Sequence, residues 1–183
     1  LYLPKIQGSI AVSGDYLIPH IAYRPFLEKP PMYFAAAAVF YKIFGTTNEG
    51  AGRLASVFFA LGTLLAVFFG TRQLAGEQAA CFSAVVLATT FKFFEISHKM
   101  VVDMALVFFI TAAMFSFILA HEGRLRHGYK LFWMSIAAAF LSKGIIGLAI
   151  PGIAVGAFVF WQQHYSFPEA FKRAWAIPGV LVI

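Results

Sequence analysis

The sequence is poor in charged residues: 12% of its 183 residues are Asp, Glu, Lys or Arg, whereas 61% are hydrophobic. About a quarter of the residues in an ordinary soluble domain are charged, and a water-soluble fold needs a polar outer layer. The 8 acidic and 14 basic side chains do not supply that layer. This scarcity excludes a soluble globular domain, and the apolar content excludes a disordered chain. A polytopic membrane protein remains.

Other absences narrow the function. The single cysteine, Cys81, lies in an apolar run and cannot form an intrachain disulfide, so it indicates no redox compartment. The sequence has no glycine-rich nucleotide loop and no G-x-S-x-G nucleophile elbow. It also lacks a basic stripe with interleaved aromatic residues, which argues against nucleic-acid binding. Several histidines are scattered without metal-ligand spacing: His20, His121, His127 and His164.

Long apolar runs follow one another from residue 53 onward. A bilayer core of about 30 Å needs about 20 apolar helical residues. The runs predict transmembrane helices at about 53–72, 78–96, 103–120, 128–143 and 144–162, with the start of another at 174. Residues 128–162 could also form one span with a buried lysine. We prefer two helices that meet at Lys143, because an unpaired lysine at mid-membrane is costly and Gly144 favours a break. Gly152 and Gly156, spaced by four, predict a helix-packing face.

The charged loops predict an orientation. The net charge is +6, and the bases Arg72, Arg124, Arg126, Lys130, Lys172 and Arg173 fall on one side of the predicted spans. The positive-inside rule makes that side cytoplasmic. Residues 1–52 then form an outer loop, with two juxtamembrane helices over residues 3–13 and from Pro30 to Gly45. Because the sequence starts at Leu1 and stops within an apolar run, we expect a fragment of a longer chain.

Three places on the outer side combine charge with unusual backbone: residues 28–31 (EKPP), residues 95–103 and residues 142–144 (SKG). Proline forces Lys29 toward extended geometry, where its ammonium suits a lipid phosphate. Pairing with Glu28 is the plainer interpretation of Lys29. Asp103 is favoured by the dipole of the helix that it begins, or it points into an outer cavity. Lys143 either reaches the membrane surface or covers an anion.

Motifs at these places resemble a known family. Residues 13–20 (SGDYLIPH) and 26–33 (FLEKPPMY) resemble the first outer loop of the GT-C superfamily of polyprenyl-phosphate-dependent glycosyltransferases. This superfamily includes aminoarabinose transferases of lipid A and protein O-mannosyltransferases. Residues 102–104 (VDM) and 141–144 (LSKG) match two later landmarks in the right order. The resemblance implies an all-α fold: a polytopic transmembrane helical bundle of the GT-C type, with juxtamembrane interfacial helices in the first outer loop.

The resemblance also implies an activity. A sugar would move, with inversion, from a polyprenyl-phosphate carrier to a lipid A-like, protein or glycan acceptor on the outer face of the membrane. Lys29 would bind the donor phosphate with Lys143 as a supporting cation, and Asp103 would be the second acidic residue, facing the sugar. The principal catalytic base is expected upstream of Leu1.

The substrate cavity would be lined by Glu28, Tyr33 and His98, and Glu28 could hold a divalent metal. The expected partners are the lipid-linked sugar donor, the acceptor and membrane lipids, with no nucleic acid. We expect an integral protein of the bacterial inner membrane whose site faces the periplasm. A transporter or flippase of a lipid-linked or anionic substrate is the alternative, and a non-catalytic subunit whose outer loop binds a partner is the third hypothesis.

Overall fold

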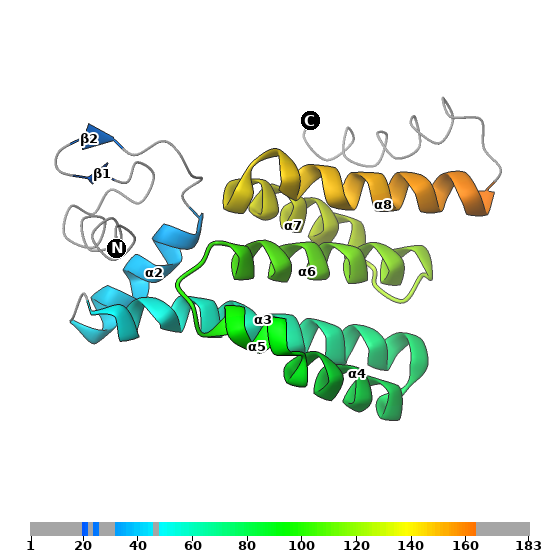
Figure 1. The fold of residues 1–183 in the computed structure, drawn as a ribbon. Coiled ribbons are helices and arrows are strands. Elements are labelled where there is room, and N and C mark those ends of the chain that lie inside the picture. The colour runs from blue at the N-terminus through cyan, green and yellow to red at the C-terminus, as the bar shows by residue number, and fades with distance from the viewer. Residues whose placement is uncertain (1–19, 22–23, 26–31, 46–47, 164–183) are drawn as a thin grey trace.

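The computed structural model describes residues 20–21, 24–25, 32–45 and 48–163. Its longer helices lie side by side along one direction, and α2 lies at the end of the bundle where α3 begins (Figure 1). A two-residue antiparallel pair, β1 (His20–Ile21) with β2 (Arg24–Pro25), precedes them. The described helices are α2 (Met32–Phe44), α3 (Glu49–Ala75), α4 (Glu77–Thr89), α5 (Phe91–Ser97), α6 (Asp103–His121), α7 (Gly128–Lys143) and α8 (Ile145–Gln163). The predicted all-α fold class is confirmed.

Two of the described helices, α3 and α6, are long and apolar enough to cross a membrane, each with a mean hydropathy of 2.1. Helix α3 begins at Glu49, four residues before the predicted span. The side chain of Asn48 accepts a hydrogen bond from the Ala51 amide at 2.9 Å, which satisfies one of the free amides at a helix start. The cap therefore sets the beginning of α3 before its apolar run starts.

The structure breaks the predicted span 78–96 at Thr90. Helices α4 and α5 are long and apolar enough to cross a membrane only together, and they are bent by 68°. The Thr89 and Thr90 hydroxyls each donate to a backbone carbonyl of α4 at 2.8 Å, and the Thr90 backbone is extended. Threonine hydroxyls can satisfy helix carbonyls in this way and bend the chain. The structure thus has two bent helices where one transmembrane helix at about 78–96 was predicted.

Helices α7 and α8 meet at Gly144. Gly144 has φ +66° and its amide donates to the Phe140 carbonyl at 2.7 Å, which ends α7. A residue with a side chain would be strained at this φ. The chain thus has two helices over residues 128–163, with Lys143 in the last turn of the first.

Close helix packing uses glycines other than the predicted pair. A Cβ atom at Gly128 would lie 2.6 Å from a carbonyl oxygen of α6, and one at Gly147 would clash with a carbonyl oxygen of α7. Small residues let membrane helices approach this closely. At Gly152 and Gly156 an added Cβ would meet nothing within 4 Å. Among the described residues nothing packs against this pair, so the packing face on α8 stays a prediction.

Two apolar clusters hold the bundle together. One joins α6, α7 and α8 through Ala113, Phe117, Phe132, Ile136 and Val155. The other joins α2, α3 and the first turn of α6 through Tyr33, Phe34, Ala37, Ala38, Ala55, Phe59, Ala60, Met104 and Ala105. The second cluster is the one that matters for the site, because Met104 and Ala105 directly follow Asp103.

Candidate functional site

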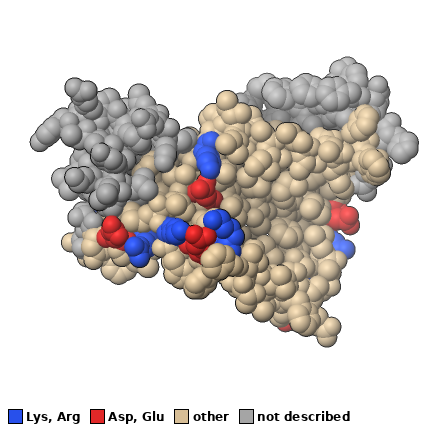
Figure 2. All heavy atoms as spheres, in the orientation of Figure 1, with Lys and Arg blue, Asp and Glu red and all other residues tan. Residues whose placement is uncertain are grey.

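Charged side chains gather mainly at the end of the bundle where α2 lies, with a smaller group at the opposite end (Figure 2). We call the end of the bundle where α2 lies the polar end. Its ion pairs join Arg53 to Glu49, Lys92 and Lys99 to Glu95, and Lys143 to Asp103. The loop between α5 and α6, the start of α6 and the end of α7 meet there. The polar end brings together Asp103 and Lys143, which lie 40 residues apart in sequence.

The Lys143 ammonium donates to Asp103 Oδ1. Asp103 begins α6 and Lys143 ends α7. The helix dipole favours a negative charge at the beginning of a helix and a positive charge at its end, so both side chains lie where the dipole favours them. The Lys143 side chain is 39% exposed and that of Asp103 is 42% exposed. A pair with this exposure contributes only about 0–1 kcal/mol to stability. The fold therefore does not depend on this contact, and an anionic ligand could replace the carboxylate at Lys143.

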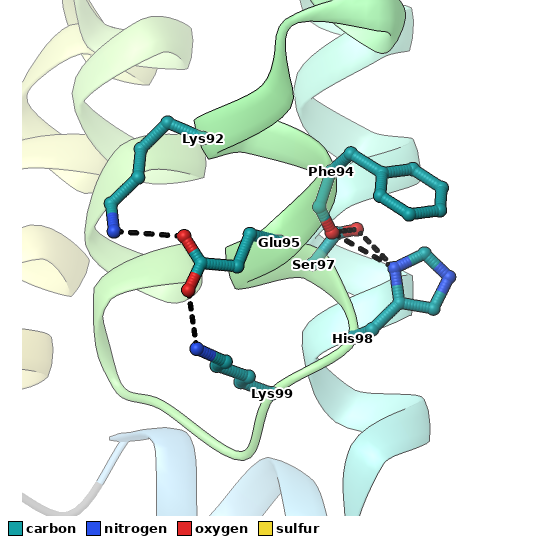
Figure 3. Close-up of polar contacts among 6 residues, drawn as sticks. All are labelled: Lys92, Phe94, Glu95, Ser97, His98 and Lys99. Atoms are coloured by element: carbon teal, nitrogen blue, oxygen red, sulfur yellow. Dashed lines mark hydrogen bonds and ion pairs between the residues drawn. The ribbon is translucent and has the colours of Figure 1, made fainter.

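Glu95 has a local explanation (Figure 3). Its carboxylate lies between Lys92 Nζ, at 2.9 Å, and Lys99 Nζ. These lysines are three residues before and four residues after Glu95, which is the ordinary spacing for side-chain pairs on a helix surface. The two lysines pair with the Glu95 carboxylate, so this carboxylate needs no ligand to balance its charge. Asp103 remains the stronger candidate for an acid that acts on a substrate.

His98, expected on the wall of the substrate cavity, lies at the polar end beside the last turn of α5. Its Nδ1 atom is 2.9 Å from both the Ser97 hydroxyl and the Phe94 carbonyl oxygen (Figure 3). The imidazole ring lies 4.5 Å from the Phe94 ring, centroid to centroid. His98 is exposed, and one of its nitrogens is engaged with its own helix end. Its role at a substrate cavity stays a prediction.

Tyr33, also expected on the cavity wall, lies in the core instead. It has no exposed surface and packs where α2 meets α3 and α6. Its hydroxyl lies 2.9 Å from Ser56 Oγ, and burial raises the pKa of the phenol to about 12. Because its ring is packed against apolar residues, Tyr33 contacts no open space in this structure. In this structure Tyr33 connects α2 to α3, and its role at a substrate cavity stays a prediction.

Ser56 is the polar-end residue that the sequence did not reveal. Its side chain has no exposed surface, and its hydroxyl donates to the Lys99 carbonyl oxygen at 2.6 Å. A lone serine in an apolar helix is common and usually bonds within its own helix. Only the fold, which places the loop between α5 and α6 beside α3, gives Ser56 its long-range partner.

Two predicted residues, Glu28 and Lys29, lie outside the described residues. The metal proposed at Glu28 therefore stays a prediction. Among the residues that the structure describes, no group of three or more His, Cys, Asp or Glu side chains could hold a metal ion.

The sequence of the chain matches a known protein family. The family described as dolichyl-phosphate-mannose-protein mannosyltransferase matches residues 28–183. The chain belongs to this family. The match covers the polar end and every described helix, which confirms the resemblance to the GT-C superfamily.

Individual relatives agree with this membership of the mannosyltransferase family. The undecaprenyl phosphate-alpha-4-amino-4-deoxy-L-arabinose arabinosyl transferase of Aeromonas salmonicida is 28% identical over 172 residues, covering 92% of this chain and 31% of the relative. The protein of the same name from Shewanella sediminis is 30% identical over 184 residues, covering 98% of this chain and 33% of the relative. The chain thus spans about a third of the length of these relatives.

Solved structures show the same fold. The crystal structure of ArnT from Cupriavidus metallidurans bound to undecaprenyl phosphate aligns with a TM-score of 0.86 at 22% identity, covering 99% of this chain and 34% of ArnT. The apo structure of the same protein aligns with a TM-score of 0.84. The described part of this mannosyltransferase-family chain therefore has the fold of the corresponding third of a GT-C membrane protein.

Proposed function

We propose that the chain is part of a membrane glycosyltransferase that moves a sugar from a polyprenyl-phosphate carrier to an acceptor. The observation that carries this proposal is the accessible Asp103–Lys143 pair, held at one end of a fold that ArnT shares. The family match supports the reaction class, and ArnT was crystallised with undecaprenyl phosphate.

Acidic and basic side chains have different parts in the proposed reaction. In the proposed reaction an acceptor oxygen attacks the anomeric carbon of the donor sugar, and the bond from that carbon to the carrier phosphate oxygen breaks with inversion. The acceptor proton passes to a general base, expected upstream of Leu1. Lys29 and Lys143 neutralise the charge that builds on the departing phosphate. Asp103, released from Lys143 by that phosphate, faces the sugar.

A lipid acceptor fits best, because relatives over nearly the whole chain are named aminoarabinose transferases. The proposed acceptor is a lipid A-like molecule. Transfer to a protein or to a glycan is the alternative result of the test. The proposed location is the bacterial inner membrane, with the polar end facing the periplasm. The predicted cytoplasmic bases fit this topology, since Arg124 contacts Gln73 at the opposite end of the bundle.

The structure gives the transporter alternative less support. Transport pathways place ionisable groups near the middle of the membrane. In the two described candidate spans, residues 54–71 of α3 and 104–120 of α6 carry no charged side chain. The charges lie at the helix ends, where a carrier headgroup would be reached from the membrane surface.

The test is transfer by the full-length protein in proteoliposomes, with labelled polyprenyl-phosphate sugars and with lipid A, peptide and glycan acceptors. Lys29→Ala should abolish transfer and leave membrane insertion intact, because the phosphate loses its main cation. Lys130→Ala, at the other end of α7 from Lys143, is the matched control and should transfer normally. Unchanged turnover in Lys29→Ala removes Lys29 from the mechanism. No transfer by the unaltered protein to any acceptor overturns the function.

A further inference from the structure

The loop between α5 and α6 is tied to α3 by one buried hydroxyl. Ser56 Oγ donates to the Lys99 carbonyl oxygen at 2.6 Å, across 43 residues of sequence. The same carbonyl accepts from the Val101 amide at 3.0 Å, and the Lys99 amide donates to the Ile96 carbonyl at 3.1 Å. The Lys99 peptide is therefore the centre of the turn from which α6 begins.

The hydrogen bonds form a directed chain that starts on α2. The single hydroxyl proton of Ser56 goes to the Lys99 carbonyl, so the contact between Tyr33 and Ser56, at 2.9 Å, has the Tyr33 hydroxyl as its donor. Both side chains have no exposed surface. Helix α2, helix α3 and the loop are thus joined by the hydrogen bonds of two side chains that have no exposed surface.

Asp103 lies four residues after Lys99, at the first position of α6. The residues that follow it, Met104 and Ala105, are buried against α2 and α3. The beginning of α6 therefore has an apolar anchor after Asp103 and a hydrogen-bonded anchor before it. The apolar anchor fixes the helix, whereas the turn before Asp103 depends on the Lys99 carbonyl and its partners.

We propose that Ser56 is a positioning residue for Asp103: through the Lys99 carbonyl it holds the turn that sets where the Asp103 carboxylate lies relative to Lys143. This inference rests on the proposed function, in which Asp103 faces the donor sugar. Among the described residues no hydrogen bond joins Ser56 to Asp103 or Lys143, so Ser56 acts through the Lys99 backbone.

Ser56→Ala removes this connection without adding volume. The Lys99 carbonyl keeps only the Val101 amide among its described partners, and the Tyr33 hydroxyl loses its hydrogen bond to Ser56. A displacement of about 1 Å at a reacting group can lower turnover by about 100-fold. We expect kcat to fall by about tenfold or more in Ser56→Ala, with a change in donor KM below about twofold, because the phosphate-binding lysines are untouched.

Thr63→Val is the matched control. Thr63 lies seven residues after Ser56 on α3 and is 1% exposed, and its hydroxyl donates to the Phe59 carbonyl of the same helix at 2.8 Å. The substitution removes a buried hydroxyl from α3 but leaves the loop connection intact. Tyr33→Phe keeps the bond from Ser56 to Lys99 and should lie between the two. The expected order of lost turnover is Ser56→Ala, then Tyr33→Phe, then Thr63→Val.

The experiment uses the full-length protein in nanodiscs and two readouts. Hydrogen–deuterium exchange should rise in residues 98–106 of Ser56→Ala and stay unchanged in Thr63→Val. Transfer kinetics should show the fall in kcat, and Ser56→Ala should cause no further loss in a protein that already carries Asp103→Asn, because a positioning residue acts only through the group it positions.

Three results overturn the inference. Equal exchange of residues 98–106 in Ser56→Ala and Thr63→Val would show that Ser56 does not hold the turn. An unchanged kcat in Ser56→Ala, or a full further loss on top of Asp103→Asn, would show that the turn does not act through Asp103. With transfer by the unaltered protein intact, each of these results overturns this inference alone. Absence of transfer by the unaltered protein overturns the proposed function and this inference together.

Discussion

The two ends of the bundle use basic side chains differently. At the polar end, Lys143 is neutralised by the carboxylate of Asp103, and both side chains are accessible. At the opposite end, the Arg124 guanidinium donates to the Gln73 carbonyl in the last turn of α3. An arginine that satisfies a free helix-terminal carbonyl has a structural role. An exposed pair of side chains can change partners, and the opposite end has such a pair too, Arg72 with Glu77 at 3.7 Å. The comparison therefore gives Arg124 a structural role, whereas ligand binding at the polar end stays a prediction.

Asp103→Asn should have the largest effect in this comparison. The substitution keeps the size of the side chain and removes its charge, so turnover of the full-length protein should fall by about 100-fold or more if the carboxylate faces the sugar. Glu122→Gln, an exposed acid at the C-cap of α6, is the control at the opposite end and should leave turnover unchanged. Initial rates of sugar transfer in proteoliposomes measure both. Equal losses in the two variants would erase the distinction between the ends.

Lys143→Met should have an intermediate effect. A charge-assisted hydrogen bond to a phosphate contributes about 1.5–3 kcal/mol, so we expect the donor KM to rise by about tenfold or more. Thermal stability in detergent should change little, since an exposed pair contributes about 0–1 kcal/mol.

Lys130→Met is the control for Lys143→Met, because Lys130 lies in the first turn of the same helix at the opposite end. Its donor KM should equal that of the unaltered protein. Loss of stability in Lys143→Met with a normal KM would assign Lys143 to assembly after all.

Glu95→Gln should have the smallest effect, a change in turnover below about twofold, because the Glu95 carboxylate is engaged by lysines on either side of it in sequence. Transfer rates measured beside Asp103→Asn give the comparison directly. A larger loss in Glu95→Gln than in Asp103→Asn would mean that Glu95 is the acid that serves the reaction.

The features that the sequence predicted correctly are helix spans and helix ends, which depend on residues close together in the chain. The apolar runs predicted α3 and α6, and the SKG motif predicted a charged helix end at Lys143, because Gly144 accepts a backbone conformation that other residues avoid. Asp103 was expected in the first turn of a helix, where the helix dipole favours a carboxylate, and the structure has it there.

What the sequence did not predict is partly local and partly a matter of contacts between distant segments. The break at Thr90 depends on side-chain bonds to carbonyls one turn earlier, and threonines are also ordinary in unbroken helices. Tyr33 and Ser56 are each unremarkable in sequence. Their connection exists only because α2 and the loop before α6 both pack against α3. Periodicity indicates which face of a helix is apolar, but it does not indicate which helix covers that face.

The uncharged lengths of α3 and α6 agree with one another. Arg53 and Arg72 are 19 residues apart on α3, and Asp103 and His121 are 18 residues apart on α6. At 1.5 Å per residue the intervals measure about 27–29 Å along the helix axes, close to the roughly 30 Å hydrocarbon core of a bilayer. Both helices can therefore stand nearly upright, with their polar ends among the headgroups and little hydrophobic mismatch for the acyl chains to absorb.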